Sequence, residues 1–305
     1  MAPLKVQLIH PGVQMNYNCK RKNNPGYRWI NNDLIREWNT DKEHKRKFIH
    51  HCGDYVTDIN SQPIKTDDLF FWGEWEGNSY FTPFCDCKND KRLWPNGVHN
   101  LFHSLEIRGS QNTDPYIFGD NFIYAICRQN GQLRNLDPGS VILFGTVYNS
   151  EKEKVFAIDT VFVTSSRWHS SKDVCAKKGK EYSQIWHEES CEQFGDDFVD
   201  KNFRVYKSQT WWDNKDFFSF VPTRLTHDGC GFKRLEIDLN DPVLNLNTNT
   251  QGVSYLKECN LTPYEFWKYI IEKALEQDFV LGVRFPEPNI VNLGIPQEIL
   301  EGEAC

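Results

Sequence analysis

The sequence predicts an α+β fold in which a central, mostly antiparallel sheet, strongly twisted or closed into a barrel, is flanked by a few helices. Two observations support this prediction. Between residues 116 and 165, three runs rich in β-branched and aromatic residues alternate with turn-forming stretches. Near the C-terminus, one segment combines helix-start signals with apolar residues at helical spacing.

The three runs are expected to form an antiparallel meander. They read "YIFGDNFIYAIC", "SVILFGTVY" and "KVFAIDTVFVTS", with "RQNGQLRNLDPG" and "NSEKE" between them. Pro138 fixes φ at the second position of a turn and Gly139 tolerates a positive φ, so a type II turn should start the strand near Ser140. Further strands are predicted at "FFSFVPTRL", "KRLEIDL" and "FVLGVRF".

The clearest predicted helix spans residues 263–277. Thr262 is a favourable N-cap, Pro263 occupies the first helical position, and Glu265 completes a capping box. The apolar residues that follow share one helical face: Phe266, Ile270, Ile271, Ala274 and Leu275.

The N-terminal region is expected to begin with a strand, "KVQLIH", and to continue as a mostly helical segment from about Asn32 to Ile49. Leu34, Ile35, Trp38 and Phe48 could share a face of that helix. No repeat or linker marks a boundary, so the chain is predicted to be a single composite domain, 1–305. Its parts are a basic α/β segment (1–64), a barrel-like core (65–166) and an α+β extension (167–305).

The net charge and the distribution of charged residues limit the kinds of ligand that we expect the protein to bind. The net charge of −7 disfavours sequence-blind binding to long nucleic acid, which relies on many Lys and Arg contacts to phosphates. The first 50 residues nevertheless hold ten Lys and Arg against four acidic residues. This basic region suits one short anionic ligand, such as a nucleotide or a strand end, or is simply the solvated face of a helix.

Cellular location and redox state also follow from composition. The N-terminus has no apolar run of signal-peptide length, and no stretch is apolar enough to cross a membrane, so we expect a soluble, cytoplasmic protein. The ten cysteines are spaced irregularly, which predicts mostly reduced thiols rather than a disulfide framework.

The stretch "FFWGEWEGNSY" at 70–80 is the first candidate binding segment. In a strand, Trp72, Glu74 and Glu76 would share one face and Trp75 would lie on the other. An indole can stack on a base while carboxylates accept its hydrogen bonds. Alternatively, both tryptophans are core residues and the glutamates pair with surface arginines. Glu74 and Glu76 are also candidates for a catalytic carboxylate pair.

Two further segments provide candidate polar groups. In "GSQNTDPYIFGDNF" (109–122), Asn112 and Asp114 stand in a turn, where such residues often bond the local backbone. A loop at a barrel mouth also holds polar specificity groups beside an apolar wall, here Tyr116 and Phe118. The segment "HKRKF" supplies cations that would meet a phosphate, namely Lys45, Arg46 and Lys47.

The sequence contains no motif that identifies a particular reaction. It contains no phosphate-binding P-loop, complete dinucleotide loop, nucleophile elbow or H-E-x-x-H pair. Cys85, Cys87, His99 and His103 are of types that suit tetrahedral zinc, although they could equally be loop thiols and hydrogen-bonding histidines. No other cofactor is expected. A Cys–His nucleophile, at "HHC" (50–52) or Cys191, is a further possibility.

A family resemblance emerges from these segments. The run "LDPGSVILFGTVYNSEKEKVFAIDTVFVTS" resembles the strand-turn-strand core of PUA-like β-barrels, including the ASCH and EVE branches. With "WGEWEGNS" and "QNTDPYIFG", it is also similar to uncharacterised prokaryotic and phage proteins associated with nucleotide modification. The resemblance covers about 65–165 and implies recognition of a nucleobase, often modified, in a cleft on a small barrel. Some ASCH proteins are hydrolases, but their G-x-K-x-x-E-x-R signature is absent here, so no catalytic residue is carried over.

The sequence therefore predicts recognition of a nucleotide, a modified nucleobase or a short single strand, in a nucleic-acid modification or phage-defence context and without a membrane partner. The alternatives are a hydrolase or transferase acting on a nucleotide-like small molecule, with Glu74 or Glu76 as base or with the zinc set, and an acidic protein-interaction module. The predicted ligand-binding residues are Trp72 and Trp75 for stacking, Glu74, Asn112 and Asp114 for the base edge, Tyr116 for the pocket wall, and Lys45, Arg46 and Lys47 for phosphate.

Overall fold

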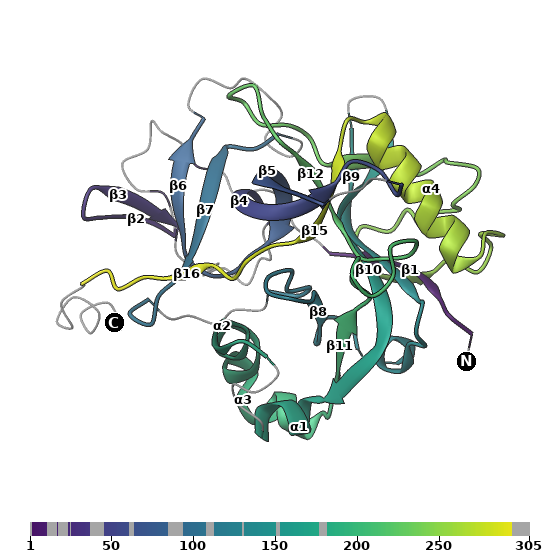
Figure 1. Cartoon of the computed structure of the whole chain (residues 1–305), viewed down its shortest axis with the longest axis horizontal. Helices are drawn as coiled ribbons and strands as arrows, with labels where there is room; N and C mark the ends of the chain where they lie inside the picture. Colours follow the sequence, from purple (N-terminus) through teal and green to yellow (C-terminus); the bar gives the residue numbers. More distant parts are fainter. Residues whose placement is uncertain are drawn as a thin grey trace.

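The computed structural model describes two mixed sheets, with helices at their edges (Figure 1). The described residues are 2–10, 17, 24, 26–36, 46–60, 64–84, 94–107, 113–129, 131–150, 153–176 and 182–294. The strands are β1 (Lys5–Ile9), β2 (Tyr27–Ile30), β3 (Asp33–Arg36), β4 (Arg46–Val56), β5 (Lys65–Glu74), β6 (Ser79–Pro83), β7 (Gly97–His103), β8 (Ile123–Tyr124), β9 (Val141–Asn149), β10 (Lys154–Ser170), β11 (Arg204–Ser208), β12 (Val221–Arg224), β13 (Leu235–Asp238), β14 (Gly252–Tyr255), β15 (Val280–Arg284) and β16 (Asn289–Ile290).

The seven-stranded sheet has the order β14-β1-β9-β10-β11-β8, with β13 paired to β10. Its centre is the antiparallel hairpin β9–β10, which confirms the predicted pairing of "SVILFGTVY" with "KVFAIDTVFVTS". The first run of the predicted meander does not pair with β9, whose neighbours are β1 and β10. The predicted turn before β9 is also present. Gly139 has φ 81°, and the Ser140 N–H donates to the Asp137 carbonyl at 3.1 Å.

The nine-stranded sheet has the order β15-β12-β5-β4-β7-β6-β3-β2, with β16 paired to β7. β15 pairs with both β12 and β4, while β5 pairs with both of those strands, so the four strands close into a ring. Among the described strands, pairing is antiparallel except for β1 with β9, β4 with β7 and β16 with β7. The fold is therefore a mixture of α and β elements that is mostly β.

The helices lie in two places. The helix α4 (Pro263–Glu276) has the predicted capping box between Thr262 and Glu265, and its buried Trp267 donates from Nε1 to the Phe218 carbonyl at 2.7 Å. In Figure 1 the other helices gather beside β11 and β8, away from α4. These helices, which the sequence analysis did not predict, are α1 (Ser171–Ala176), α2 (Gln184–Trp186), a π-helical turn η2 (His187–Cys191) and α3 (Glu192–Asp200), and a 3₁₀ turn η1 (Gln132–Asn135) precedes β9.

The helix predicted from Asn32 to Ile49 is wrong. β3 occupies 33–36 and β4 begins at Arg46, while 37–45 lie outside the described residues. β4 pairs with β5 along nearly its whole length, from Arg46 opposite Glu74 to Tyr55 opposite Lys65. Burial of both faces at the start of β4 explains the error, because a two-sided strand shows no alternation that distinguishes it from a helix.

The first strand predicted in the meander, at 116–127, is mostly irregular. Only β8 is a strand there, and Tyr116 and Phe118 make isolated bridges. The interruption follows from Gly119, which has φ 83°, and from the turn at Asp120 and Asn121. This irregular segment leaves polar side chains at the surface, where they become part of a cleft.

The described cysteines are mostly reduced thiols, as expected, with one exception. Cys52, Cys127, Cys175, Cys191 and Cys259 form no disulfide, whereas Cys230 is disulfide-bonded. The remaining cysteines lie outside the described residues.

Candidate functional site

The described parts of three candidate segments, 46–48, 70–80 and 113–118, contact one another. Arg46 Nη1 lies 2.7 Å from Glu74 Oε2, joining β4 to β5. Lys47 Nζ donates to the Gly77 carbonyl at 2.8 Å, and the Glu76 N–H donates to Thr113 Oγ1 at 3.0 Å. Arg46, Lys47, Glu74 and Glu76 are all buried, so these contacts do not form an open binding surface.

A buried group of four charges, here called the charged centre, links the two sheets. It consists of Arg46, Glu74, Asp159 and Arg234. Asp159, on β10, accepts a hydrogen bond from Arg46 Nε and lies 3.3 Å from Arg234 Nε. Burial opposes the charge on Arg46, but Glu74 and Asp159 overcome this effect and raise the pKa of the guanidinium above its usual value. The four charges balance, as burial requires.

Arg234 is unusual within the charged centre. Its guanidinium lies 4.7 Å from the centre of the Trp72 ring, and its two terminal nitrogens have no hydrogen-bond partner among the described residues. Contact with an indole face compensates part of the cost of burying a cation.

Both candidate tryptophans are buried in the core. Trp72 is 2% exposed and donates from Nε1 to the Phe232 carbonyl at 2.7 Å. Trp75 is 0% exposed and donates to the Asn78 carbonyl at 2.9 Å. The two indoles pack in different hydrophobic clusters, so the structure places them as core residues and not on a common open face.

Asp114 serves its local backbone. Its carboxylate accepts hydrogen bonds from the N–H groups of Ala125, Ile126 and Cys127, at 2.9, 2.9 and 2.5 Å. Burial raises the pKa of Asp114 to about 6, although these N–H groups act in the opposite direction. Two other predicted residues, Asn112 and Lys45, lie outside the described residues.

The zinc set cannot be assembled from the described residues. His99 Nδ1 lies 2.8 Å from Ser79 Oγ, and His103 Nε2 lies 2.5 Å from Glu188 Oε2. The two histidines thus bind different partners, while Cys85 and Cys87 lie outside the described residues. Within the part of the chain that the structure describes, no group of three or more His, Cys, Asp or Glu side chains is arranged to hold a metal.

An open cleft lies elsewhere on the molecule, where five distant segments meet. It has a volume of about 630 Å³ and adjoins a second hollow of about 240 Å³ that shares Asp120, Asn121 and Arg284 with it. We refer to both hollows together as the cleft. Its walls come from the segment before β8, the start of α2, the ends of β10, β11 and β15, and the loop after β11. The lining residues are Phe118, Gly119, Asp120, Asn121, Ile123, Arg167, Tyr182, Ser183, Lys207, Thr210, Trp212, Asp213, Arg284, Pro286 and Glu287.

Cations lie against aromatic rings in this cleft. Lys207 Nζ lies 4.7 Å from the centre of the Tyr182 ring, and the Arg284 guanidinium lies 5.0 Å from the Trp212 ring. Arg284 Nη2 also lies 2.7 Å from Asp54 Oδ2. The Trp212 side chain is 47% exposed, so much of it is open to solvent.

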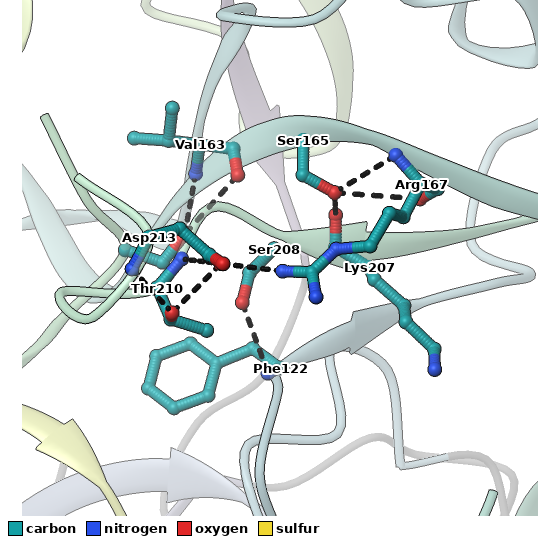
Figure 2. Close-up of polar contacts among 9 residues, drawn as sticks. Phe122, Val163, Ser165, Arg167, Lys207, Ser208, Thr210 and Asp213 are labelled. Carbon is teal, nitrogen blue, oxygen red and sulfur yellow. Dashed lines mark hydrogen bonds and ion pairs between the residues drawn. The ribbon is translucent and has the colours of Figure 1, made fainter. Parts of the chain in front are cut away.

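The loop that carries Trp212 is fixed by a polar network (Figure 2). Figure 2 shows Arg167 reaching from β10 to the carboxylate of Asp213, which also accepts hydrogen bonds from the hydroxyl and N–H of Thr210 at 2.8 and 3.2 Å. Although partial burial acts in the opposite direction, the hydrogen bonds from Thr210 and the charge of Arg167 lower the pKa of Asp213. Arg167 and Asp213 thus connect the loop to β10.

Carboxyl and amide groups occupy the other side of the cleft. Glu287 Oε2 accepts a hydrogen bond from the Tyr116 hydroxyl, so Tyr116 contacts a cleft residue without lining the cleft itself. Burial raises the pKa of Glu287, against hydrogen bonds from Tyr116 and Ser183 that lower it. The side-chain oxygen of Asn121 is buried and has no hydrogen-bond partner among the described residues.

Comparison with known proteins gives no family. No family model, curated protein or solved structure matches this chain. In the described residues, no helix has the length and apolar character needed to cross a membrane.

Only a small part of the cleft lies in a segment that the sequence singles out. The stretch 109–122 was selected as a source of polar specificity groups, and Asp120 and Asn121 of that stretch do line the cleft. The sequence did not indicate that Lys207, Arg284 and Trp212 belong to one site, because these residues come from separate strands and loops. In "TWWDN", Trp211 is buried and Trp212 is exposed, a difference that composition alone does not show.

Proposed function

We propose that this protein recognises a nucleotide or a modified nucleobase, free or in a short single strand, and that it does so in the cleft. One observation carries the proposal. A hollow of nucleotide size combines an exposed indole, two cations beside aromatic rings, and carboxyl and amide oxygens. Stacking surface, phosphate partners and base-edge acceptors are the three groups that nucleotide recognition requires.

Each group has a defined part in the proposal. A base stacks on Trp212, whose ring position is fixed by Arg284 and by the loop that Arg167 and Asp213 hold. Lys207 contacts the phosphate as a mobile point charge. Asp120 and Glu287 accept hydrogen bonds from amino and imino groups of the base.

The resemblance to PUA-like proteins remains part of the proposal. The closed ring of β4, β5, β12 and β15 supports it only as a ring of strands, because β5 alone lies within the residues that carry the resemblance, 65–165. The cleft includes Arg284 at the end of β15, so one strand of the ring contributes to it. A role in nucleic-acid modification or phage defence is proposed on the same basis.

Calorimetric titration with nucleosides, nucleotides, modified bases and short single strands tests the proposal. Wild-type protein should bind at least one member of the panel. Trp212→Ala should weaken binding by about 1–3 kcal/mol, because stacking on an aromatic face contributes this much per base. Trp29→Ala is the matched control, since Trp29 is 67% exposed on β2, in the other sheet.

A second pair of variants separates phosphate from base. Lys207→Ala should weaken binding of nucleotides more than binding of the corresponding nucleosides, whereas Lys172→Ala, on α1, should affect neither. Absence of binding across the whole panel would overturn the proposal, as would equal effects of Trp212→Ala and Trp29→Ala.

Hydrolysis of a nucleotide-like small molecule is the second candidate, and Glu287 favours it. This carboxyl lines the cleft, has a raised pKa and has the carboxyl of Asp120 among its charged neighbours, which is how general acids are arranged. Turnover of a panel member by the wild type, lost in Glu287→Gln with binding retained, would support this candidate. Binding without turnover would leave recognition as the function.

A further inference from the structure

A thiol and an imidazole face each other at a second place in the molecule, outside the cleft. Cys127 Sγ lies 3.6 Å from His10 Nε2, which is within hydrogen-bond distance for sulfur. Cys127 follows β8, at one edge of the seven-stranded sheet, and His10 follows β1, the second strand from the other edge. Each residue is 7% exposed, so both are largely buried.

The backbone of each partner is fixed by several hydrogen bonds. The Cys127 N–H donates to Asp114 Oδ2 at 2.5 Å, and the Cys127 carbonyl accepts from the Tyr124 hydroxyl at 2.6 Å. The His10 N–H donates to the Gly145 carbonyl at 2.9 Å, and the His10 carbonyl accepts from Thr146 Oγ1 at 3.1 Å. The short distance between sulfur and imidazole is therefore part of a fixed arrangement.

The charges around Cys127 include one strong cation. A negative charge on the Cys127 sulfur is among the interactions that raise the pKa of Arg46, after those of Glu74 and Asp159. The same interaction stabilises the thiolate. Asp114 and Tyr124 also interact with this position, and a charged Asp114 opposes the thiolate. The charge of Arg46 acts in the opposite direction to that of Asp114.

We propose that Cys127 and His10 form a thiolate–imidazolium pair and that this pair is a nucleophilic site for an electrophilic, unsaturated carbon of a small molecule. A buried cysteine is more often an inert apolar residue. Here an imidazole at hydrogen-bond distance and a guanidinium nearby provide the two features by which proteins activate thiols.

The proposed step is a simple addition. The proton of Cys127 moves from Sγ to His10 Nε2, and the thiolate forms a sulfur–carbon bond with the unsaturated carbon. The electron pair of the carbon–oxygen or carbon–carbon double bond moves to its far atom, which then takes the proton back from the imidazolium. The S–H group has then added across a double bond, and no oxidant or reductant is needed.

Alkylation by iodoacetamide, resolved by peptide mass spectrometry, tests the pair without knowledge of its substrate. The structure supplies internal references. Cys52 is free and exposed, while Cys259 is free and almost fully buried. At mildly acidic pH, Cys127 should react faster than Cys52, because a paired thiolate persists where an ordinary thiol is protonated.

The variant His10→Gln identifies the role of the imidazole. It should lower the alkylation rate of Cys127 at mildly acidic pH by about tenfold or more, and leave the rate of Cys52 unchanged. Far-UV circular dichroism and the melting temperature of His10→Gln report whether the fold is kept. If the variant does not fold, the wild-type pH profile decides alone.

Two results would overturn the proposal. One is a Cys127 rate in the folded wild type that is as slow as that of Cys259 at every pH, which would make Cys127 an inert core residue. The other is an alkylation rate of Cys127 that rises with pH in parallel with that of Cys52, which would show that no thiolate is stabilised.

Discussion

The charged centre and the cleft both pair arginine with carboxylate, but they place the pair in opposite surroundings. In the charged centre, the side chains of Arg46 and Glu74 are 1% and 2% exposed. In the cleft, those of Arg167 and Asp213 are 46% and 35% exposed. Water screens the Arg167–Asp213 pair, whose charged groups remain accessible to a ligand. The buried charges of Arg46 and Glu74 are compensated only by other residues of the charged centre. The same chemistry therefore connects the two sheets at one place and offers a binding surface at the other.

Arg46→Met should be among the two most destabilising substitutions considered, together with Trp72→Ala. It leaves Glu74 and Asp159 buried with one arginine instead of two, and breaking a buried pair in this way costs about 3–5 kcal/mol. Urea unfolding measures the change. A loss below about 1 kcal/mol would show that water reaches the charged centre, and the contrast with the cleft would disappear.

Trp72→Ala should destabilise the fold by about 3–5 kcal/mol, because it removes a buried indole and its hydrogen bond to Phe232. Trp212→Ala, at an exposed position, should change the free energy of unfolding by only about 0.5 kcal/mol. Thermal unfolding of both variants compares them directly. Similar losses would contradict the assignment of one indole to the core and the other to the cleft.

The stability of the protein should depend on pH through Asp114. Because its pKa is raised from 3.8 to about 6 in the folded state, the folded protein binds the proton more tightly than the unfolded chain. The free energy of unfolding should therefore fall as pH rises from about 3 to about 7, by roughly 3 kcal/mol in total. Urea titrations at several pH values measure this slope. Asp114→Asn should remove it, and an identical slope in wild type and variant would contradict the prediction.

Asp213→Asn should give the smallest effect. An exposed ion pair contributes about 0.2–1 kcal/mol, and the amide oxygen of asparagine can still accept from Thr210. The loss should shrink further at high salt, because screening weakens the pair in the wild type. Chemical unfolding at two salt concentrations checks this expectation. A loss as large as that of Arg46→Met would mean that the cleft pair is structural.

Local signals predicted part of the fold well. The hairpin β9–β10 and the capping box of α4 follow from short stretches whose residues have one favoured conformation. The segment 32–49 failed because β3 and β4 are shaped by their partner strands, and pairing is not visible in a single segment. Helices α1 to α3 are short, so their patterns are weak.

The site was harder to predict than the fold. Composition located the segments around Arg46, Glu74 and Thr113, and the structure brings them together. The exposure of these side chains could not be predicted from the sequence, because a buried ion pair and a ligand-facing ion pair contain the same types of residue. The cleft was missed in most of its parts, since Lys207, Trp212 and Arg284 become neighbours only through the tertiary fold.

The most direct test of the account measures nucleotide binding and stability together in Trp212→Ala and Trp72→Ala. Trp212→Ala should lose binding of the nucleotide that wild type binds most tightly and keep the wild-type melting temperature. Trp72→Ala should have a lower melting temperature and, below that temperature, still bind the nucleotide. Wild-type affinity in Trp212→Ala, with binding lost in folded Trp72→Ala, would place the ligand at the charged centre and contradict the account.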